Sequence, residues 1–142
     1  MLLGFDPIAK EQKAVCSQTE FLREYATKWK AAPLHEEIDQ KALTQLVPTI
    51  FYLKEGLGDI YKKEEEFLRS TLGYLAADEI KIKHQHIIDT IDGIYRSLLS
   101  LKCQMKQLNK EYIWDDIDSL CQSINQLCRE ESQFSYLGPI KS

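Results

Sequence analysis

Residues 60–73 read I-Y-K-K-E-E-E-F-L-R-S-T-L-G, and this stretch contains both the spacing that predicts the fold and the first candidate functional residue. Its apolar residues recur at intervals of three and four, which is the spacing of one face of an α-helix. Glu64 falls on that face, between Ile60 and Phe67. Gly73 comes directly after the last apolar residue, a position where glycine commonly ends a helix. The stretch therefore predicts the end of a helix with one glutamate on its buried side.

Two further stretches repeat this arrangement of a polar residue within an apolar face. Residues 127–137 read L-C-R-E-E-S-Q-F-S-Y-L, and Glu131 lies between Leu127 and Phe134. Residues 84–108 have the most regular pattern of the chain, and His84 begins it. Steps of three and four alternate without a break, as expected for a helix in a bundle. The pattern comprises His84, Ile87, Ile91, Ile94, Leu98, Leu101, Met105 and Leu108.

The same periodicity predicts four long helices, at residues 7–31, 42–72, 76–108 and 111–135. Proline is well tolerated in the first turn of a helix, so Asp6-Pro7 is a suitable start for the first. Pro48 predicts a kink or a late start for the second, with residues 34–41 as a connection containing a short helical turn. Asn109 ends the third helix, and the fourth stops before Gly138-Pro139. Short connections make neighbouring helices antiparallel, so we expect an all-α, up-down-up-down four-helix bundle forming a single domain over residues 1–142.

The composition excludes several classes of protein. The 142 residues are 44% hydrophobic and 28% charged, with a net charge of −4, as in an ordinary globular domain. No basic block is present, which disfavours nucleic-acid binding, and no apolar run is long enough to cross a membrane. The N-terminal residues do not resemble a signal peptide, so we expect a cytoplasmic protein. Four cysteines without a C-x-x-C motif suit a reducing compartment and are expected to serve packing: Cys16, Cys103, Cys121 and Cys128.

The three polar residues of the apolar faces fall at one height of the predicted bundle. Glu64 lies eight residues before the end of the second helix and His84 eight residues after the start of the third, while Glu131 lies near the end of the fourth. The first helix would bring Glu11 to the same end. Carboxylates and histidines from facing helices hold transition metals in bundle proteins, so Glu64, His84 and Glu131 are candidate ligands for one zinc or iron ion. The alternative is a Glu64–His84 salt bridge without metal.

These residues resemble the hemerythrin-like (HHE) cation-binding family, which carries a His-x-x-x-Glu motif on its second and fourth helices. Y-K-K-E-E-E-F-L, K-H-Q-H and L-C-R-E-E-S-Q-F are similar to the family's ligand-bearing segments. Ile60, Ile88 and Leu127 stand where family histidines are expected, so the resemblance implies a degenerate member without the di-iron centre. It also implies that Tyr61 or Cys128 lies near a remaining single-metal site. The flanking acids are expected on a solvated face: Glu65, Glu66 and Glu130.

A second resemblance is to the regulator of sigma D, a family of anti-sigma factors. It rests on D-Q-K-A-L-T-Q-L at residues 39–46 and Y-L-K-E-G-L-G-D-I-Y at residues 52–61. The resemblance implies a bundle of the same length that regulates transcription by covering its partner's surface.

The sequence contains no phosphate-binding loop and no H-E-x-x-H motif, so we expect no enzyme, no catalytic residues and no organic cofactor. The first interpretation is a non-catalytic regulatory or adaptor-type bundle that binds another protein or forms a homodimer. Aromatic residues outside the buried faces are the candidate contacts: Tyr95, Tyr112 and Trp114. The two alternatives are a metal sensor that uses the Glu/His cluster and an anti-sigma regulator.

Overall fold

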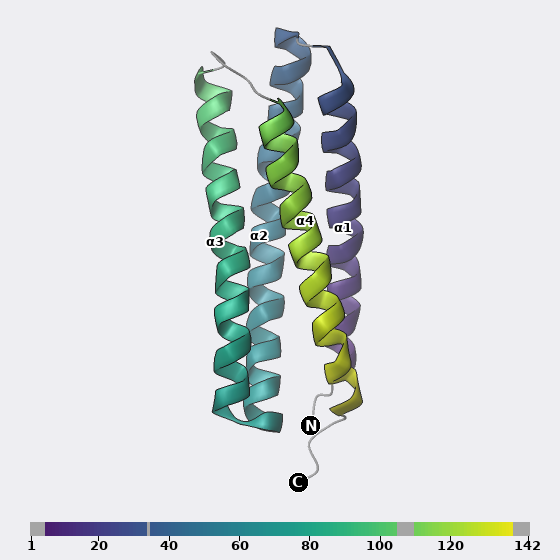
Figure 1. Cartoon of the computed structure of the whole chain (residues 1–142), viewed down its shortest axis with the longest axis vertical. Helices are drawn as coiled ribbons and strands as arrows, with labels where there is room; N and C mark the ends of the chain where they lie inside the picture. Colours follow the sequence, from purple (N-terminus) through teal and green to yellow (C-terminus); the bar gives the residue numbers. More distant parts are fainter. Residues whose placement is uncertain (1–4, 34, 105–109, 138–142) are drawn as a thin grey trace.

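Four long helices lie side by side in the structure, a computed structural model that describes residues 5–33, 35–104 and 110–137 (Figure 1). They are α1 (Asp6–Ala31), α2 (Glu36–Leu72), α3 (Tyr74–Gln104) and α4 (Lys110–Glu131). A short 3-10 helix, η1 (Ser132–Leu137), continues α4. The described ranges contain no strand, which confirms the predicted all-α bundle.

Contacts at two levels show that helices in contact run in opposite directions. Trp29 of α1 meets Asp39 of α2, His84 of α3 meets Glu65 of α2, and Thr19 of α1 meets Asn125 of α4. Ion pairs join the same helices at other levels. Lys63 Nζ of α2 lies 2.7 Å from Glu11 Oε1 of α1, and Lys54 Nζ of α2 lies 2.9 Å from Asp92 Oδ1 of α3. Arg23 Nη2 of α1 lies 2.7 Å from Asp118 Oδ1 of α4. In Figure 1 the α1–α2 connection is at the upper end and the α2–α3 turn at the lower end.

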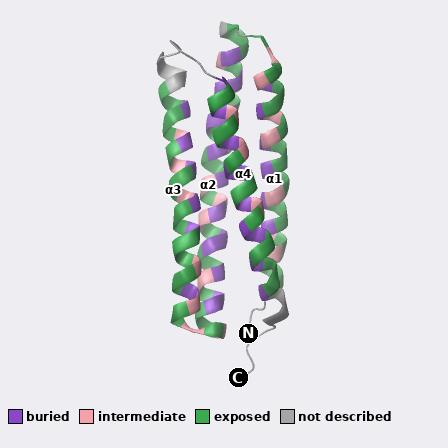
Figure 2. Cartoon of the chain, in the orientation of Figure 1, coloured by how far each residue is buried: buried purple, intermediate pink, exposed green. Residues whose placement is uncertain are grey.

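The core consists mainly of aliphatic side chains with a few aromatic ones. Figure 2 shows buried residues recurring along all four helices. This follows from the three-and-four spacing, because such residues share one face of a helix. The predicted residues of α3 are buried as far as Leu98, and those of α4 from Ile113 to Phe134. On α1 the polar residues of the buried face are Gln12 and Thr19.

The largest error in the predicted boundaries concerns the start of α2. The helix begins at Glu36, so the predicted connection over residues 34–41 and the late start caused by Pro48 were both wrong. Proline inside a helix costs about 3 kcal/mol through a lost hydrogen bond and a steric clash. Each large apolar side chain that this segment buries contributes about 1.5–3 kcal/mol, which outweighs that cost. Those side chains are Leu43, Leu46 and Val47.

The other boundaries differ less from the prediction. α4 ends as an α-helix at Glu131, and the rest of the predicted helix takes the 3-10 form. The predicted end of the third helix at residue 108, with Asn109 after it, lies outside the described residues. So does the predicted stop at Gly138-Pro139.

A buried ion pair closes the upper end of the bundle. Lys110 Nζ lies 2.9 Å from Asp39 Oδ1 and donates to the backbone carbonyls of Trp29, Ala32 and Pro33 at 3.0–3.3 Å. Asp39 also accepts from Trp29 Nε1 at 2.9 Å and from the His35 backbone N–H at 3.3 Å. Lys110 thereby caps the C-terminal carbonyls of α1 and links three helices.

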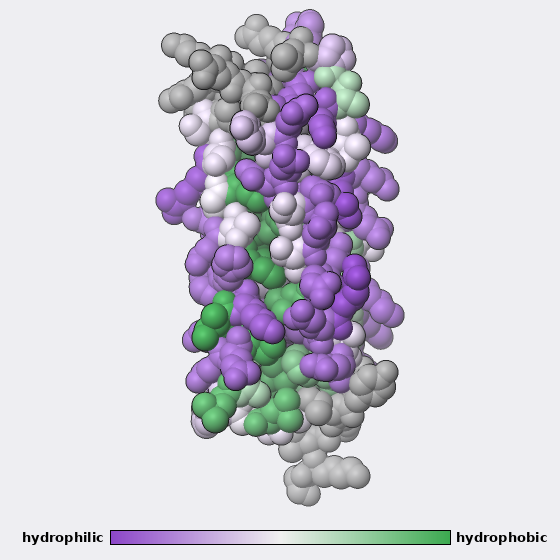
Figure 3. All heavy atoms as spheres, viewed as in Figure 1, coloured by the Kyte–Doolittle hydropathy of each residue, from purple (hydrophilic) through white to green (hydrophobic). Residues whose placement is uncertain are grey.

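The outer surface is mainly polar. None of the helices, over the residues that the structure describes, has the length and apolar character needed to cross a membrane. Figure 3 shows apolar side chains gathered at the lower end of this face. Leu72, Tyr74 and Leu75, at the α2–α3 turn, are among the exposed large side chains of the chain.

Candidate metal centre

Glu64, His84 and Glu131 meet inside the lower half of the bundle, as the sequence predicted. His84 Nε2 lies 2.9 Å from Glu131 Oε2 and 3.3 Å from Glu64 Oε2. One ligand atom from each residue lies within 4.8 Å of the other two. The exposed fractions are 0% for Glu64, 2% for His84 and 1% for Glu131, so all three groups are withdrawn from bulk water. Three helices thus supply two carboxylates and one imidazole at a single level.

The other nitrogen of His84 is held by a residue that sequence analysis assigned to the solvated face. His84 Nδ1 lies 2.9 Å from Glu65 Oε2, and the Glu65 side chain is only 15% exposed. A carboxylate at Nδ1 orients the imidazole and would hold the Nδ1 proton if Nε2 bound a cation. Histidine ligands of metals are commonly held in this way. The expectation for Glu65 was therefore wrong.

The first helix contributes an amide to the layer. Gln12 Nε2 donates a hydrogen bond to Glu64 Oε1, which fixes the orientation of that carboxylate. Glu11 reaches the same end of the bundle but lies on the outside, where it pairs with Lys63. Glu66 is exposed, and Glu130 forms an ion pair with Lys83 at 3.6 Å, so these two acids do lie on the outer face.

Tyr61 covers one face of the imidazole. The Tyr61 and His84 rings stack in parallel, with centroids 3.7 Å apart and planes 2° apart. Burial is the main cause that raises the pKa of Tyr61 far above its ordinary value, with nearby Cys128 and Glu64 adding to it. Among the described residues, three buried side-chain oxygens have no hydrogen-bond partner: Tyr61 Oη, Glu64 Oε2 and Glu131 Oε1. Two of these three atoms belong to the candidate ligands.

The electrostatics of the layer favour a cation. Burial raises the pKa of Glu64, while hydrogen bonds from His84 and Gln12 oppose that rise. One imidazole faces three carboxyl groups here, and a buried carboxylate without a balancing charge costs several kcal/mol. A divalent cation among Glu64, His84 and Glu131 would neutralise the two fully buried carboxylates.

The spacing of the three donors fits a small transition-metal ion. Ligand atoms about 2.0–2.2 Å from a tetrahedral zinc ion lie roughly 3.3–3.6 Å from one another. The 3.3 Å between His84 Nε2 and Glu64 Oε2 is in that range, and the 2.9 Å to Glu131 Oε2 needs a shift of only a few tenths of an ångström. Carboxylate oxygen and imidazole nitrogen are suitable ligands for zinc and for iron. Glu64, His84 and Glu131 therefore fit the zinc or iron ion that the sequence suggested.

A small pocket leads to the layer from outside. It lies between α2 and α3 and has a volume of about 330 Å³, and Tyr61, Glu65 and His84 form part of its lining. Its lining also includes the acids Glu55 and Asp59 and the lysines Lys54, Lys62 and Lys81, so with Glu65 the acidic and basic groups are equal in number.

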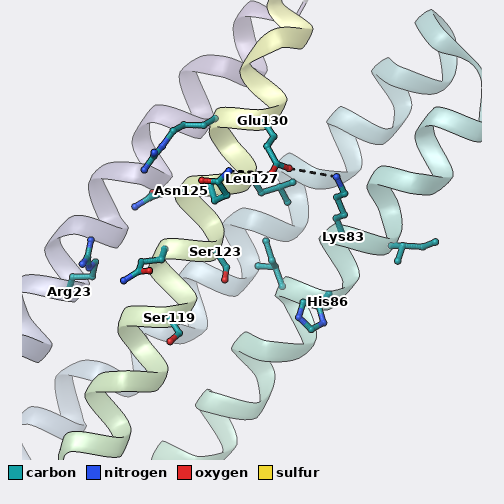
Figure 4. Close-up of a pocket in the computed structure, with 13 residues that line it drawn as sticks. Arg23, Lys83, His86, Ser119, Ser123, Asn125, Leu127 and Glu130 are labelled. Carbon is teal, nitrogen blue, oxygen red and sulfur yellow. Dashed lines mark hydrogen bonds and ion pairs between the residues drawn. The ribbon is translucent and has the colours of Figure 1, made fainter.

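A wider groove of about 1080 Å³ lies mainly over α3 and α4 (Figure 4). The side chains of His86, Ser119 and Ser123 are among those that line it, and the Lys83–Glu130 ion pair crosses it. Its lining includes none of the three candidate ligands. His86 is exposed, whereas His84 is buried.

The three aromatic residues proposed for partner binding occupy different surroundings. Trp114 is partly buried, donates from Nε1 to Thr27 Oγ1 at 2.9 Å and lies under Lys30 Nζ, 3.8 Å from the ring centroid. Tyr95 packs on Phe51, with ring centroids 5.9 Å apart. Tyr112 is 71% exposed. Trp114 therefore joins α4 to α1, whereas Tyr95 joins α3 to α2.

Comparison with known proteins finds no matching family model, no matching curated protein and no matching solved structure.

Proposed function

We propose that this bundle binds one divalent transition-metal ion, zinc or ferrous iron, through Glu64, His84 and Glu131. The observation that carries the proposal is the double engagement of His84. Its Nε2 faces two buried carboxylates, while its Nδ1 lies 2.9 Å from Glu65. A simple salt bridge needs one acid for one histidine, and here three acids surround a single imidazole. Glu131 Oε1, which has no hydrogen-bond partner, supplies further capacity for coordination.

Metal analysis of the whole chain tests this proposal. We expect one zinc ion per chain after dialysis against zinc, and the same stoichiometry for ferrous iron under anaerobic conditions. Glu64→Gln or His84→Gln should weaken binding by more than about 100-fold, since each removes a ligand. Glu65→Gln should weaken binding by about 10–100-fold, the usual effect of losing a group that orients a ligand.

The chain offers matched control substitutions. Glu66→Gln removes an exposed neighbouring glutamate, and His86→Gln removes an exposed histidine on the same helix. Both should bind metal as the unaltered chain does, with affinities measured by calorimetry. Stoichiometric binding that survives in both Glu64→Gln and His84→Gln, or no binding by the unaltered chain, would exclude the proposal.

The regulatory, adaptor and anti-sigma roles stay predictions. A bundle that binds metal without catalysis is compatible with regulation, because occupancy would change the charge and stability of the layer. No contact described above favours a sigma factor over another protein as the partner.

A further inference from the structure

One helical turn above the metal layer, two cysteines face each other from different helices. α1 and α4 are antiparallel, and their contacts define a register. Thr19 Oγ1 of α1 lies 3.2 Å from Asn125 Oδ1 of α4. One turn toward the lower end from that pair are Cys16 on α1 and Cys128 on α4, three residues away in each case. The next turn brings Gln12 and Glu131, both in the buried layer already described.

The contacts of the two thiols agree with this register. Cys16 therefore lies beside Cys128, and its proximity adds to the rise that burial causes in the pKa of Cys128. Cys16 is partly exposed, whereas Cys128 is buried. The third described cysteine, Cys121, is buried in a different setting, where its Sγ lies 3.6 Å from the Thr19 carbonyl oxygen. One accessible thiol next to one protected thiol is the arrangement of an oxidisable pair with its resolving cysteine.

We propose that Cys16 and Cys128 form a disulfide on exposure to a peroxide, and that this bond ties α1 to α4. The Cys16 sulfur attacks one oxygen of the peroxide; the O–O bond breaks, water leaves and Cys16 becomes a sulfenic acid. The Cys128 sulfur then attacks the Cys16 sulfur; the S–O bond breaks, a second water leaves and the S–S bond forms. Together the two thiols lose two electrons and two protons, and hydrogen peroxide takes these up to become two molecules of water. This proposal does not depend on metal binding.

The alternative is that both thiols only fill space in the core, since buried thiols are generally unreactive. Cys16, however, is partly exposed, so a peroxide can reach its sulfur and form the sulfenic acid. The second step is intramolecular and needs only the neighbouring thiol. Burial raises the pKa of Cys128, which protects it from direct attack and assigns the first oxidation to Cys16.

Peptide mapping of the oxidised chain tests the proposal. The full chain carrying Cys103→Ser is treated with hydrogen peroxide at neutral pH, alkylated, digested without reductant and analysed by mass spectrometry. We expect a linked peptide pair that contains Cys16 and Cys128, lighter by two hydrogen atoms than the sum of its parts. Cys121 should be recovered alkylated after unfolding. Cys121→Ser should leave the linked pair unchanged, and Cys16→Ser should abolish it.

The same oxidation in concentrated urea supplies the control for folding. Closing a short loop costs less entropy than closing a long one, so an unfolded chain should favour Cys121–Cys128 over Cys16–Cys128. A Cys16–Cys128 disulfide that forms in the folded chain but not in urea would support the proposal. A folded chain in which Cys16 accumulates as sulfenic or sulfinic acid without the linked pair, or in which Cys128 pairs with Cys121, would overturn it.

Discussion

At the scale of single residues, buried charge is balanced differently at the two ends of the bundle. Lys110 and Asp39 form one pair whose remaining hydrogen-bonding capacity is met by backbone carbonyls and by Trp29. The layer of Glu64, His84 and Glu131 has more acids than bases and retains unpartnered oxygens. The first arrangement is complete without a ligand, whereas the second gains from a cation.

The ion pair at the upper end predicts a pH-dependent loss of stability. Burial favours the neutral acid at Asp39, but hydrogen bonds from Lys110 and Trp29 outweigh it and lower the pKa of Asp39. Its stabilising effect should therefore be complete above the unfolded-state pKa of about 3.9 and disappear as the pH falls through the lower folded-state value. Asp39→Asn leaves Lys110 buried without its counter-ion and should cost about 3 kcal/mol at pH 7. The difference in free energy of unfolding between Asp39→Asn and the unaltered chain should narrow below about pH 4.

Urea unfolding followed by circular dichroism at several pH values measures this difference. Asp92→Asn is the control, because Asp92 forms ion pairs with Lys54 and Arg96 on the exposed surface. It should cause a much smaller loss at pH 7. Equal losses for the two variants, or a difference for Asp39→Asn that stays constant down to pH 3, would contradict the interpretation.

The sequence predicted the three candidate ligands but not the residues that hold them. Glu64, His84 and Glu131 were found because each interrupts a regular apolar face. Glu65 was missed because it is adjacent to the face in sequence, and only the position of α3 shows that His84 Nδ1 reaches it. Gln12 was missed because its neighbour Glu11 was expected to be the residue of the first helix that reaches this end of the bundle. Lys110 and Asp39 gave no signal, since their burial depends on the packing of three helix ends.

At the scale of elements, apolar spacing predicted all four helices, and local signals predicted their ends less well. Pro48 is a strong local signal for a helix boundary, yet α2 passes through it because the preceding residues pack into the core. Gly73 is a local signal that correctly predicted the end of a helix, since α2 ends at Leu72. Gly73 has φ 96° and ψ 178°, and its N–H donates to the Leu68 carbonyl at 3.1 Å. Glycine adopts this conformation without strain, and other residues essentially do not.

Gly73→Ala should therefore destabilise the bundle by about 1–3 kcal/mol. Gly93→Ala is a matched control in the exposed middle of α3, and it should stabilise the chain by about 0.5–1 kcal/mol. A methyl group meets no atom within 4 Å at either position, so the difference between the variants reports backbone conformation alone. Thermal and urea unfolding measure both values. A Gly73→Ala variant as stable as Gly93→Ala would show that the turn adopts another conformation.

At the scale of the whole molecule, the polar layer is expected to cost stability that a continuous apolar core would not. Replacing buried ionic groups with apolar residues of similar volume is often neutral or stabilising by about 1–4 kcal/mol. The layer interrupts a core that is mainly apolar. A costly layer in a core that could be apolar suggests that the chain retains it for binding.

The combined variant Gln12→Met, Glu64→Met, His84→Leu and Glu131→Met tests this balance between stability and binding. In the presence of a chelator it should unfold at the same or a higher urea concentration than the unaltered chain. Zinc at 100 times its dissociation constant should stabilise the unaltered chain by about 2.7 kcal/mol and leave the variant unchanged. Gln12 is included because its amide would otherwise lose the Glu64 acceptor. If the variant is instead less stable by several kcal/mol with chelator, and zinc stabilises neither chain, the layer is a structural ion pair that the fold requires.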